Sequence, residues 1–330
     1  MNRITERIAS GAVALLVAAS FVLPVSAGPA RTARAGQAVP RDGMDLSERL
    51  VAGPVVIIGR VTKAGVKFEV EVESVLRGEG VGPHLRIAFR GANLQRPIDE
   101  PPFTALEGER AIFVLEPWVD SSGDQPSPDL WQPAIGYRSR IPIPEEGGEA
   151  LVEAVREIIA AQDDPDFDAT RRRMLGWLSK RNPWLIDAAL DQAARFALVD
   201  RTWIPALVAH ALDTAPVRRR LVAEAIGRGF ERHRFRPRKS RPGDLPASDA
   251  AEDEAVAALR DTLVRLARSD PDPAVRRTAV RFLPVAGVPE AVRLLRAIAR
   301  DDPSLEVRYE AAAALRRSTA GKPGRSRRGR

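Results

Sequence analysis

Asp270-Pro-Asp-Pro-Ala-Val-Arg-Arg-Thr-Ala-Val-Arg-Phe-Leu283 returns 32 residues later as Asp302-Pro-Ser-Leu-Glu-Val-Arg-Tyr-Glu-Ala-Ala-Ala-Ala-Leu315. The apolar residues of each copy recur every three or four positions, which is the period of one face of an α-helix. Each copy begins with an Asp-Pro pair, in which Asp can cap the free N–H groups of a helix and Pro suits its first turn. Repeats of this kind are typical of stacked helix pairs.

A second helix is predicted between the two copies, over residues 290–300. Its apolar face, and that of an equivalent helix 32 residues earlier, consist of Ala291, Leu295 and Ile298, and of Leu259, Leu263 and Leu266. A single helix pair cannot bury such faces, so its neighbours in the array must cover them. We therefore predict an α-solenoid over residues 145–317.

The repeated pattern resembles the short bacterial form of the HEAT repeat, with its signature Asp-Pro-x-x-x-Val-Arg-x-x-Ala-x-x-x-Leu. The matching residues are Asp270, Pro271, Val275, Arg276, Ala279 and Leu283, and Asp302, Pro303, Val307, Arg308, Ala311 and Leu315. In that family the loop Asp and the Arg after Val commonly form a ladder between repeats. The resemblance therefore implies structural roles for Asp270, Arg276, Asp302 and Arg308.

The resemblance also implies that the second helices of the pairs line the surface where partners bind. Five arginines lie off the apolar faces of these helices: Arg265, Arg268, Arg293, Arg296 and Arg300. We take them as the candidate surface for a protein or peptide, with ordinary solvation as the alternative.

An earlier copy of the pattern begins at Pro216. Its apolar residues are Val217, Leu221 and Ala225, which stand 58 residues before Val275, Ala279 and Leu283. Because 58 exceeds the 32-residue period, we expect an insertion at about residues 229–250. With further helices predicted from residue 145 onward, the array should contain roughly four helix pairs and a last single helix.

Residues 50–144 change period. Phe68-Glu-Val-Glu-Val-Glu-Ser-Val75 alternates apolar and polar residues, as a half-buried strand does, with Glu69, Glu71 and Glu73 on a solvated face. Several short apolar runs punctuated by glycine predict five or six strands in a small barrel or sandwich. The pattern resembles the OB-like barrel of netrin-type and metalloproteinase-inhibitor modules. The expected fold class is α+β as separate domains, an all-β barrel followed by an all-α HEAT-like solenoid.

Residues 1–27 are similar to a secretory signal, with Arg3 and Arg7 before an apolar run and small residues at Val25-Ser-Ala27. A retained membrane anchor is the alternative. Residues 28–49 follow as a linker, and no later stretch is apolar enough to span a bilayer. We expect an exported protein, whether periplasmic, cell-surface or extracellular. The chain has no cysteine, which excludes disulfides, thiolate metal sites and the zinc-chelating cysteine of the inhibitors.

The net charge of +7 is unevenly distributed. Residues 28–160 hold 15 Lys and Arg against 20 Asp and Glu, whereas residues 161–330 hold 34 against 23. Much of the excess lies in residues 228–241 and in a tail, residues 318–330, whose composition is typical of disorder. The candidate polyanion contacts are Arg232, Arg234, Arg236, Arg238, Lys239 and Arg241, interleaved with Phe230 and Phe235 as single-strand stacking would require. The export signal makes an acidic envelope polymer as plausible a ligand as nucleic acid, and nucleic acid itself an unlikely partner.

No catalytic or cofactor motif occurs, and the three histidines, His84, His210 and His233, are far apart in the sequence. The acidic run at residues 163–168 lacks the glycine and glutamate of a calcium loop, so helix capping explains it better. We therefore expect no cofactor and no bound metal. The sequence favours an exported, non-enzymatic scaffold or adaptor that binds a protein or peptide. The alternatives are a polyanion-binding envelope protein and an enzyme of unknown class.

Overall fold

The computed structural model describes residues 46–65, 67–88, 105–118, 130–235 and 247–320. They belong to one compact unit, Gly43–Arg330. The expected signal and most of the expected linker lie outside the described residues. Residues 46–49, also expected in the linker, form the start of a short helix, α1 (Leu46–Val51), in which Leu50 is completely buried.

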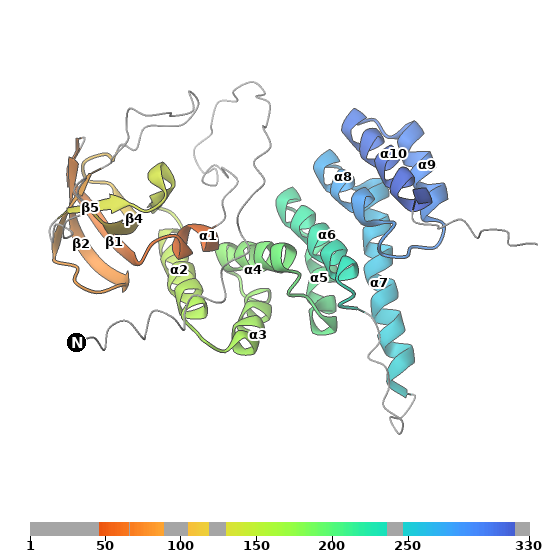
Figure 1. Cartoon of the computed structure of the whole chain (residues 1–330), viewed down its shortest axis with the longest axis horizontal. Coiled ribbons are helices and arrows are strands. Elements are labelled where there is room, and N and C mark those ends of the chain that lie inside the picture. The colour runs from red at the N-terminus through yellow and green to blue at the C-terminus, as the bar shows by residue number, and fades with distance from the viewer. Residues whose placement is uncertain (1–45, 66, 89–104, 119–129, 236–246, 321–330) are drawn as a thin grey trace, which may run out of the picture. The chain divides into compact units, whose positions relative to one another are not determined.

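A six-stranded sheet follows α1 (Figure 1). Its strands are β1 (Val55–Lys63), β2 (Lys67–Arg77), β3 (His84–Ala88), β4 (Arg110–Pro117), β5 (Leu130–Pro133) and β6 (Arg140–Pro142), with a 3-10 turn at Gly136–Ser139 before β6. Along β2 the expected alternation is confirmed, because Phe68 and Val70 are buried while Glu69 and Glu71 are exposed.

The strand pairings run in a ring. β1 pairs antiparallel with β2 and β2 with β3, while β3 pairs parallel with β5. β5 then pairs antiparallel with β4, and β4 returns to β1. β6 extends the sheet by pairing with β4.

The two faces of the sheet belong to different apolar clusters. Ile57, Phe68 and Phe113 lie in a cluster made by strand residues and by Ala105, which precedes β4. Val56 and Ile112, which point to the other face, belong to the large cluster that runs through the helices. Because the sheet and the helices share this cluster, their separation into two domains stays a prediction.

Nine helices follow the sheet in the described part of the chain, if the short α5 is included. They are α2 (Gly148–Gln162), α3 (Phe167–Trp177), α4 (Pro183–Phe196), α5 (Ile204–His210), α6 (Pro216–Glu231), α7 (Ala247–Ser269), α8 (Pro273–Phe282), α9 (Ala291–Asp301) and α10 (Leu305–Ala320). A 3-10 turn, Arg201–Trp203, leads into α5.

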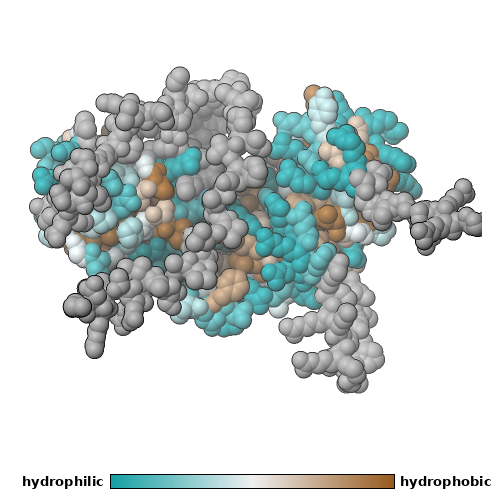
Figure 2. Space-filling view, in the orientation of Figure 1, coloured by the Kyte–Doolittle hydropathy of each residue, from teal (hydrophilic) through white to brown (hydrophobic). Residues whose placement is uncertain are grey.

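The helices stack as pairs. α3 packs on α4, α5 on α6, α7 on α8 and α9 on α10 (Figure 1). Successive pairs contact each other through one helix each, so that α4 packs on α6, α6 on α8 and α8 on α10. The prediction of about four pairs is therefore confirmed. The single helix was placed at the wrong end, because α2 precedes the pairs and α10 is the partner of α9. Figure 2 shows a mostly hydrophilic surface over these helices, with hydrophobic residues in small separate spots.

The predicted register of α6 was wrong by one residue. Pro216 and Pro273 both occupy the first turn of their helices, α6 and α8, which sets the offset at 57 rather than 58. The equivalent of Val275 is consequently Arg218, not Val217. The apolar pattern alone misled the alignment, because the fixed spacing from the loop to the helix start decides the register. The extra residues lengthen the end of α6 and the start of α7 as well as the segment between them, around the expected insertion.

α6 and α8 approach closely where Gly227 faces Phe282. A Cβ atom on Gly227 would lie only 2.0 Å from Cγ of Phe282. The Phe282 side chain is 1% exposed, so its ring fills the space that a larger residue on α6 would occupy. This contact fixes the distance between the second and third helix pairs.

Candidate functional site

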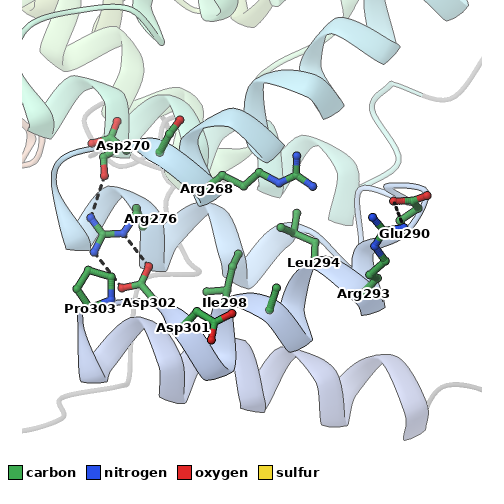
Figure 3. Close-up of a pocket in the computed structure, with 12 residues that line it drawn as sticks. Arg268, Asp270, Arg276, Glu290, Arg293, Leu294, Ile298, Asp301, Asp302 and Pro303 are labelled. Atoms are coloured by element: carbon green, nitrogen blue, oxygen red, sulfur yellow. Dashed lines mark hydrogen bonds and ion pairs between the residues drawn. The ribbon is translucent and has the colours of Figure 1, made fainter.

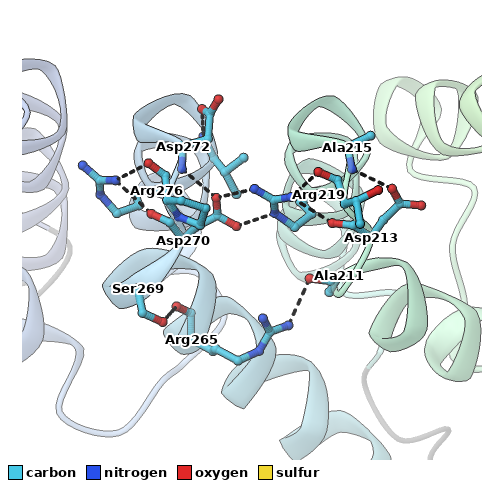
Figure 4. A network of polar contacts seen from close by, with 12 residues as sticks. Ala211, Asp213, Ala215, Arg219, Arg265, Ser269, Asp270, Asp272 and Arg276 are labelled. Atoms are coloured by element: carbon cyan, nitrogen blue, oxygen red, sulfur yellow. Dashed lines mark hydrogen bonds and ion pairs between the residues drawn. The ribbon is translucent and has the colours of Figure 1, made fainter.

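A ladder of arginines and aspartates joins successive helix pairs (Figure 4). In its first full rung Arg219 of α6 donates two hydrogen bonds to Asp270, from Nε to Oδ2 at 2.7 Å and from Nη2 to Oδ1 at 2.9 Å. In the next rung Arg276 of α8 holds Asp302 in the same two-bond geometry, both at 2.9 Å. All four side chains are buried, so these are desolvated, charge-assisted pairs.

Each rung arginine is also held by the loop of its own helix pair. The Nη1 group of Arg219 donates to the backbone carbonyl of Asp213 at 2.8 Å. In the same way Arg276 donates to the backbone carbonyl of Asp270 at 2.8 Å, and Arg308 to that of Asp302 at 2.7 Å. This bond orients the guanidinium so that its remaining edge points toward the next loop.

The loop aspartates also brace the turns that start the helices. Oδ1 of Asp270 accepts the Asp272 N–H at 2.9 Å, and Oδ1 of Asp302 accepts the Ser304 N–H at 2.8 Å. Asp213 receives the Ala215 N–H at 2.8 Å in the same way. One carboxylate thus shapes a turn and binds the preceding repeat.

The structure brings together three of the four ladder residues expected from the sequence, Asp270, Arg276 and Asp302. It places Arg308 at the ladder position, where no carboxylate of the described residues lies on its outer edge. Sequence reasoning missed Arg219, because the misjudged register assigned the ladder position to Arg218. Arg218 instead bridges α4 and the loop before α6. It donates from Nε to Oδ1 of Asp187 at 2.9 Å and from Nη1 to Oδ2 of Asp213 at 3.1 Å. The Asp-to-Pro spacing of the loops, equal at residues 213–216 and 270–273, would have identified Arg219.

The pKa values of the ladder follow from these contacts. The hydrogen bond to Asp302 raises the pKa of the Arg276 guanidinium. Burial raises the pKa of the Asp302 carboxyl, but hydrogen bonds from Arg276 and the Ser304 N–H outweigh it, and the net pKa lies below its usual value. Asp213 behaves alike, since bonds from the Ala215 N–H and Arg218 overcome the effect of burial.

Acid is expected to weaken the ladder. A carboxyl whose pKa is lowered by folding stabilises the protein above its unfolded pKa, about 3.9 for Asp, and this stabilisation is lost as the pH falls through the lower folded pKa. Urea unfolding between about pH 7 and pH 3 should therefore show a loss of stability below about pH 4. The loss should be smaller in Asp302→Asn, which has no carboxyl to protonate there. An identical acid dependence in that variant would contradict the assignment.

A groove of about 530 Å³ lies beside the ladder, between the end of α7 and α9 (Figure 3). We call it the α7–α9 groove. Its lining residues are Arg268, Ser269, Asp270, Arg276, Glu290, Arg293, Leu294, Ala297, Ile298, Asp301, Asp302 and Pro303. Leu294, Ala297 and Ile298 give it an apolar wall, while Arg268 and Arg293 bring cations from α7 and α9.

Two of the five candidate surface arginines therefore meet in one groove. Arg268 is exposed and has no ion pair or hydrogen bond in the part of the chain that the structure describes. Arg293 is 84% exposed and lies 3.7 Å from Glu290, a contact that solvent weakens.

The other three candidate arginines lie apart from the groove lining. Arg265 donates to the Ala211 carbonyl at 3.2 Å and so links α7 to the preceding pair (Figure 4). Arg300 pairs with the adjacent Asp301 at 2.7 Å. Arg296 is exposed on α9 but does not line the groove.

The aromatic part of the polyanion prediction was wrong. Phe235 is 3% exposed and packs edge-on against Phe230, with ring centroids 5.0 Å apart. Gly229 makes room for it, because a Cβ there would lie 2.4 Å from the Phe235 ring. Neither ring is available to stack on a base.

The polyanion arginines are only partly described. Arg232 donates to the Phe196 carbonyl at 3.4 Å, and Arg234 is exposed. Arg236, Arg238, Lys239 and Arg241 lie outside the described residues.

The remaining polar features serve local structure. Asp166 caps α3 by accepting the N–H groups of Asp168 and Ala169, as the capping interpretation expects. His210 lies 2.8 Å from the Leu178 carbonyl and is packed within the helices. Among the described residues, no group of three or more His, Cys, Asp or Glu could hold a metal ion, and no helix is long and apolar enough to cross a membrane.

Stacked helix pairs joined by buried arginine–aspartate rungs, preceded by a six-stranded sheet, define a helical-repeat protein. Residues 249–316 match the family model described as HEAT repeats, which confirms the resemblance seen in the sequence for that segment. No curated protein matches the chain, and no solved structure matches it either.

Proposed function

We propose that this protein is an exported, non-enzymatic scaffold or adaptor that binds a protein or peptide in the α7–α9 groove. The observation that carries the proposal is that Arg268 and Arg293 line the same preformed groove, which also has an apolar wall. HEAT repeats in general mediate protein interactions, and the matching segment contains the whole groove.

The groove suits one or two side chains of a partner. Its volume of about 530 Å³ falls in the range of small ligand sites, which is about 300–1,000 Å³. An apolar anchor could contact Leu294 and Ile298, and an adjacent carboxylate could reach the uncommitted guanidinium of Arg268. The buried rungs on Asp270 and Asp302 hold the walls in place, so little ordering is needed on binding.

The test is selection of short peptides from a random display library against the full chain. The selected peptides are expected to place an acidic residue beside an apolar one. Arg268→Gln should weaken their binding by about tenfold, the value of one charge-assisted hydrogen bond. Arg277→Gln is the matched control, because Arg277 is an exposed arginine on α8 that does not line the groove. Equal affinity of both variants would count against the groove.

Polyanion binding is the alternative. Its support is now the charge of residues 228–241 and of the tail, without the aromatic stacking, since Phe230 and Phe235 are buried. Binding to polyphosphate that collapses between about 50 and 200 mM salt would favour it over the groove.

The amino-terminal sheet and export complete the proposal. The ring of pairings from β1 through β2, β3, β5 and β4 supports a small OB-like barrel. Export rests on residues 1–27, and an amino terminus at Gly28 in the protein recovered outside the producing cell would support it.

A further inference from the structure

The carboxy-terminal end of the described array is built like the inside of the array. Three positions on α6 and α8 are covered by the next helix pair and buried, namely Arg219, Ala223 and Ile226, and Arg276, Val280 and Leu283. Their equivalents on α10 are Arg308, Ala312 and Leu315, and all three are partly exposed. A terminal repeat that faced only water would be expected to carry a polar outer face.

Arg308 is held in the pose of a rung that lacks its carboxylate. Its Nη1 group donates to the Asp302 carbonyl at 2.7 Å, which is the bond that orients Arg219 and Arg276 in their own loops. The Nε and Nη2 groups, which bind the next aspartate in both of those residues, have no hydrogen-bond acceptor within the described ranges. The half-buried guanidinium therefore presents a two-donor edge outward.

Apolar surface surrounds this edge. Leu305 is 54% exposed and Tyr309 67% exposed on the same side of α10 as Ala312. We call Leu305, Arg308, Tyr309, Ala312 and Leu315 the terminal face. Tyr and Arg, two residues of this face, are among the residue types enriched at protein interfaces.

We propose that the terminal face docks a helical hairpin of another protein, whose helix-starting loop places an aspartate on Arg308 and so continues the ladder. The chemistry of the occupant follows from the two inner rungs. In each of them a loop carboxylate accepts hydrogen bonds from the guanidinium edge that Arg308 presents outward.

Two other occupants fit the charges less well. A second copy docking by the same face would oppose two Arg308 side chains. Residues 321–330, which follow α10, contain five Lys and Arg and no Asp or Glu, so they supply no side-chain carboxylate.

The chain's own last hairpin is the best available probe, because its Asp302 already fits the inner rung. A copy of residues 284–315 inserted directly after Leu315 keeps the natural Leu–Pro junction and the 32-residue period. The copied Asp302 then lies one repeat beyond Arg308. Urea unfolding is measured for the natural and extended chains, each with and without Arg308→Gln, and for an extended chain whose copied aspartate is changed to Asn.

The expected result is coupling. Arg308→Gln should reduce the folding equilibrium constant about a hundredfold or more beyond its effect in the natural chain, because only in the extended chain does Arg308 hold a buried carboxylate. Changing the copied aspartate to Asn should remove this difference. Arg296→Gln, on the exposed side of α9, is the matched control and should cost the same in both chains.

Three results would overturn the proposal. An inserted hairpin that unfolds in a separate transition would show that the terminal face does not accept it, as would equal costs of Arg308→Gln in both chains. A natural chain that dimerises in sedimentation, and becomes monomeric on Arg308→Gln, would make a second copy the occupant.

If the extended chain does not fold, a peptide of residues 300–320 titrated into the natural chain decides the question, and binding that Arg308→Gln does not weaken counts against the proposal.

Discussion

Replacing Arg276 by Gln is expected to lower the free energy of unfolding by about 3–5 kcal/mol, because it leaves the buried Asp302 carboxylate without its counter-charge. Arg276 is 7% exposed and Asp302 8%, so water cannot replace the lost donors. The same change removes the bond to the Asp270 carbonyl and loosens two loops at once. Urea unfolding followed by circular dichroism measures the effect.

Arg277→Gln is the control for this prediction. Arg277 also bridges two repeats, to Glu306 at 2.8 Å, but the two side chains are 41% and 72% exposed. Such a pair contributes about 1 kcal/mol or less. Replacing both members of the buried rung, as in Arg276→Met with Asp302→Leu, should destabilise less than Arg276→Gln alone. If Arg276→Gln cost no more than Arg277→Gln, the rung would not be a structural element.

Phe282→Ala is expected to cost about 3–5 kcal/mol, because it empties the space between α6 and α8. Gly227→Ala is expected to cost about 1–3 kcal/mol for the opposite reason, since its new Cβ would meet the same ring at 2.0 Å. The double variant should be clearly less destabilised than the sum of the two, because the added methyl group occupies part of the space that the ring leaves.

Chemical denaturation of the four proteins in this cycle gives the coupling between Gly227 and Phe282. Tyr309→Ala serves as a control for loss of an aromatic ring, since Tyr309 is 67% exposed in the chain alone and should contribute little. Strict additivity of the two core substitutions would contradict the close approach of α6 and α8.

The sequence predicted the repeat architecture well where local rules suffice. The spacing of Val275, Ala279 and Leu283 defines a helix face, and the Asp-Pro loops mark its start, so the last two repeats were predictable. The rung between Arg276 and Asp302 was implied by the resemblance to HEAT repeats and not by these local rules. The alternation along β2 was predictable for the same reason.

Long-range features were not predictable in this way. The register of α6 depends on the length of the loop before it. Arg218 stands where α8 has the apolar Val275, so the apolar pattern alone does not align α6 with α8. Phe235 reads as a stacking residue among arginines, yet Gly229 and Phe230 bury it. The α7–α9 groove collects residues from α7, α8 and α9, and only the stacking of the pairs decides that Arg268 lies in it while Arg265 does not.

The ladder has a direction, and this matters while the chain is being made. Each rung takes its arginine from an earlier helix and its aspartate from a later loop, as Arg219–Asp270 and Arg276–Asp302 show. Domains fold from the amino terminus first during synthesis. A chain that emerges amino terminus first, whether from the ribosome or during export, therefore presents each rung arginine before its aspartate and never a rung aspartate without its arginine. The growing array carries its unmet charge on a long side chain that can still reach water, which should keep each partial product from collapsing around an uncompensated carboxylate.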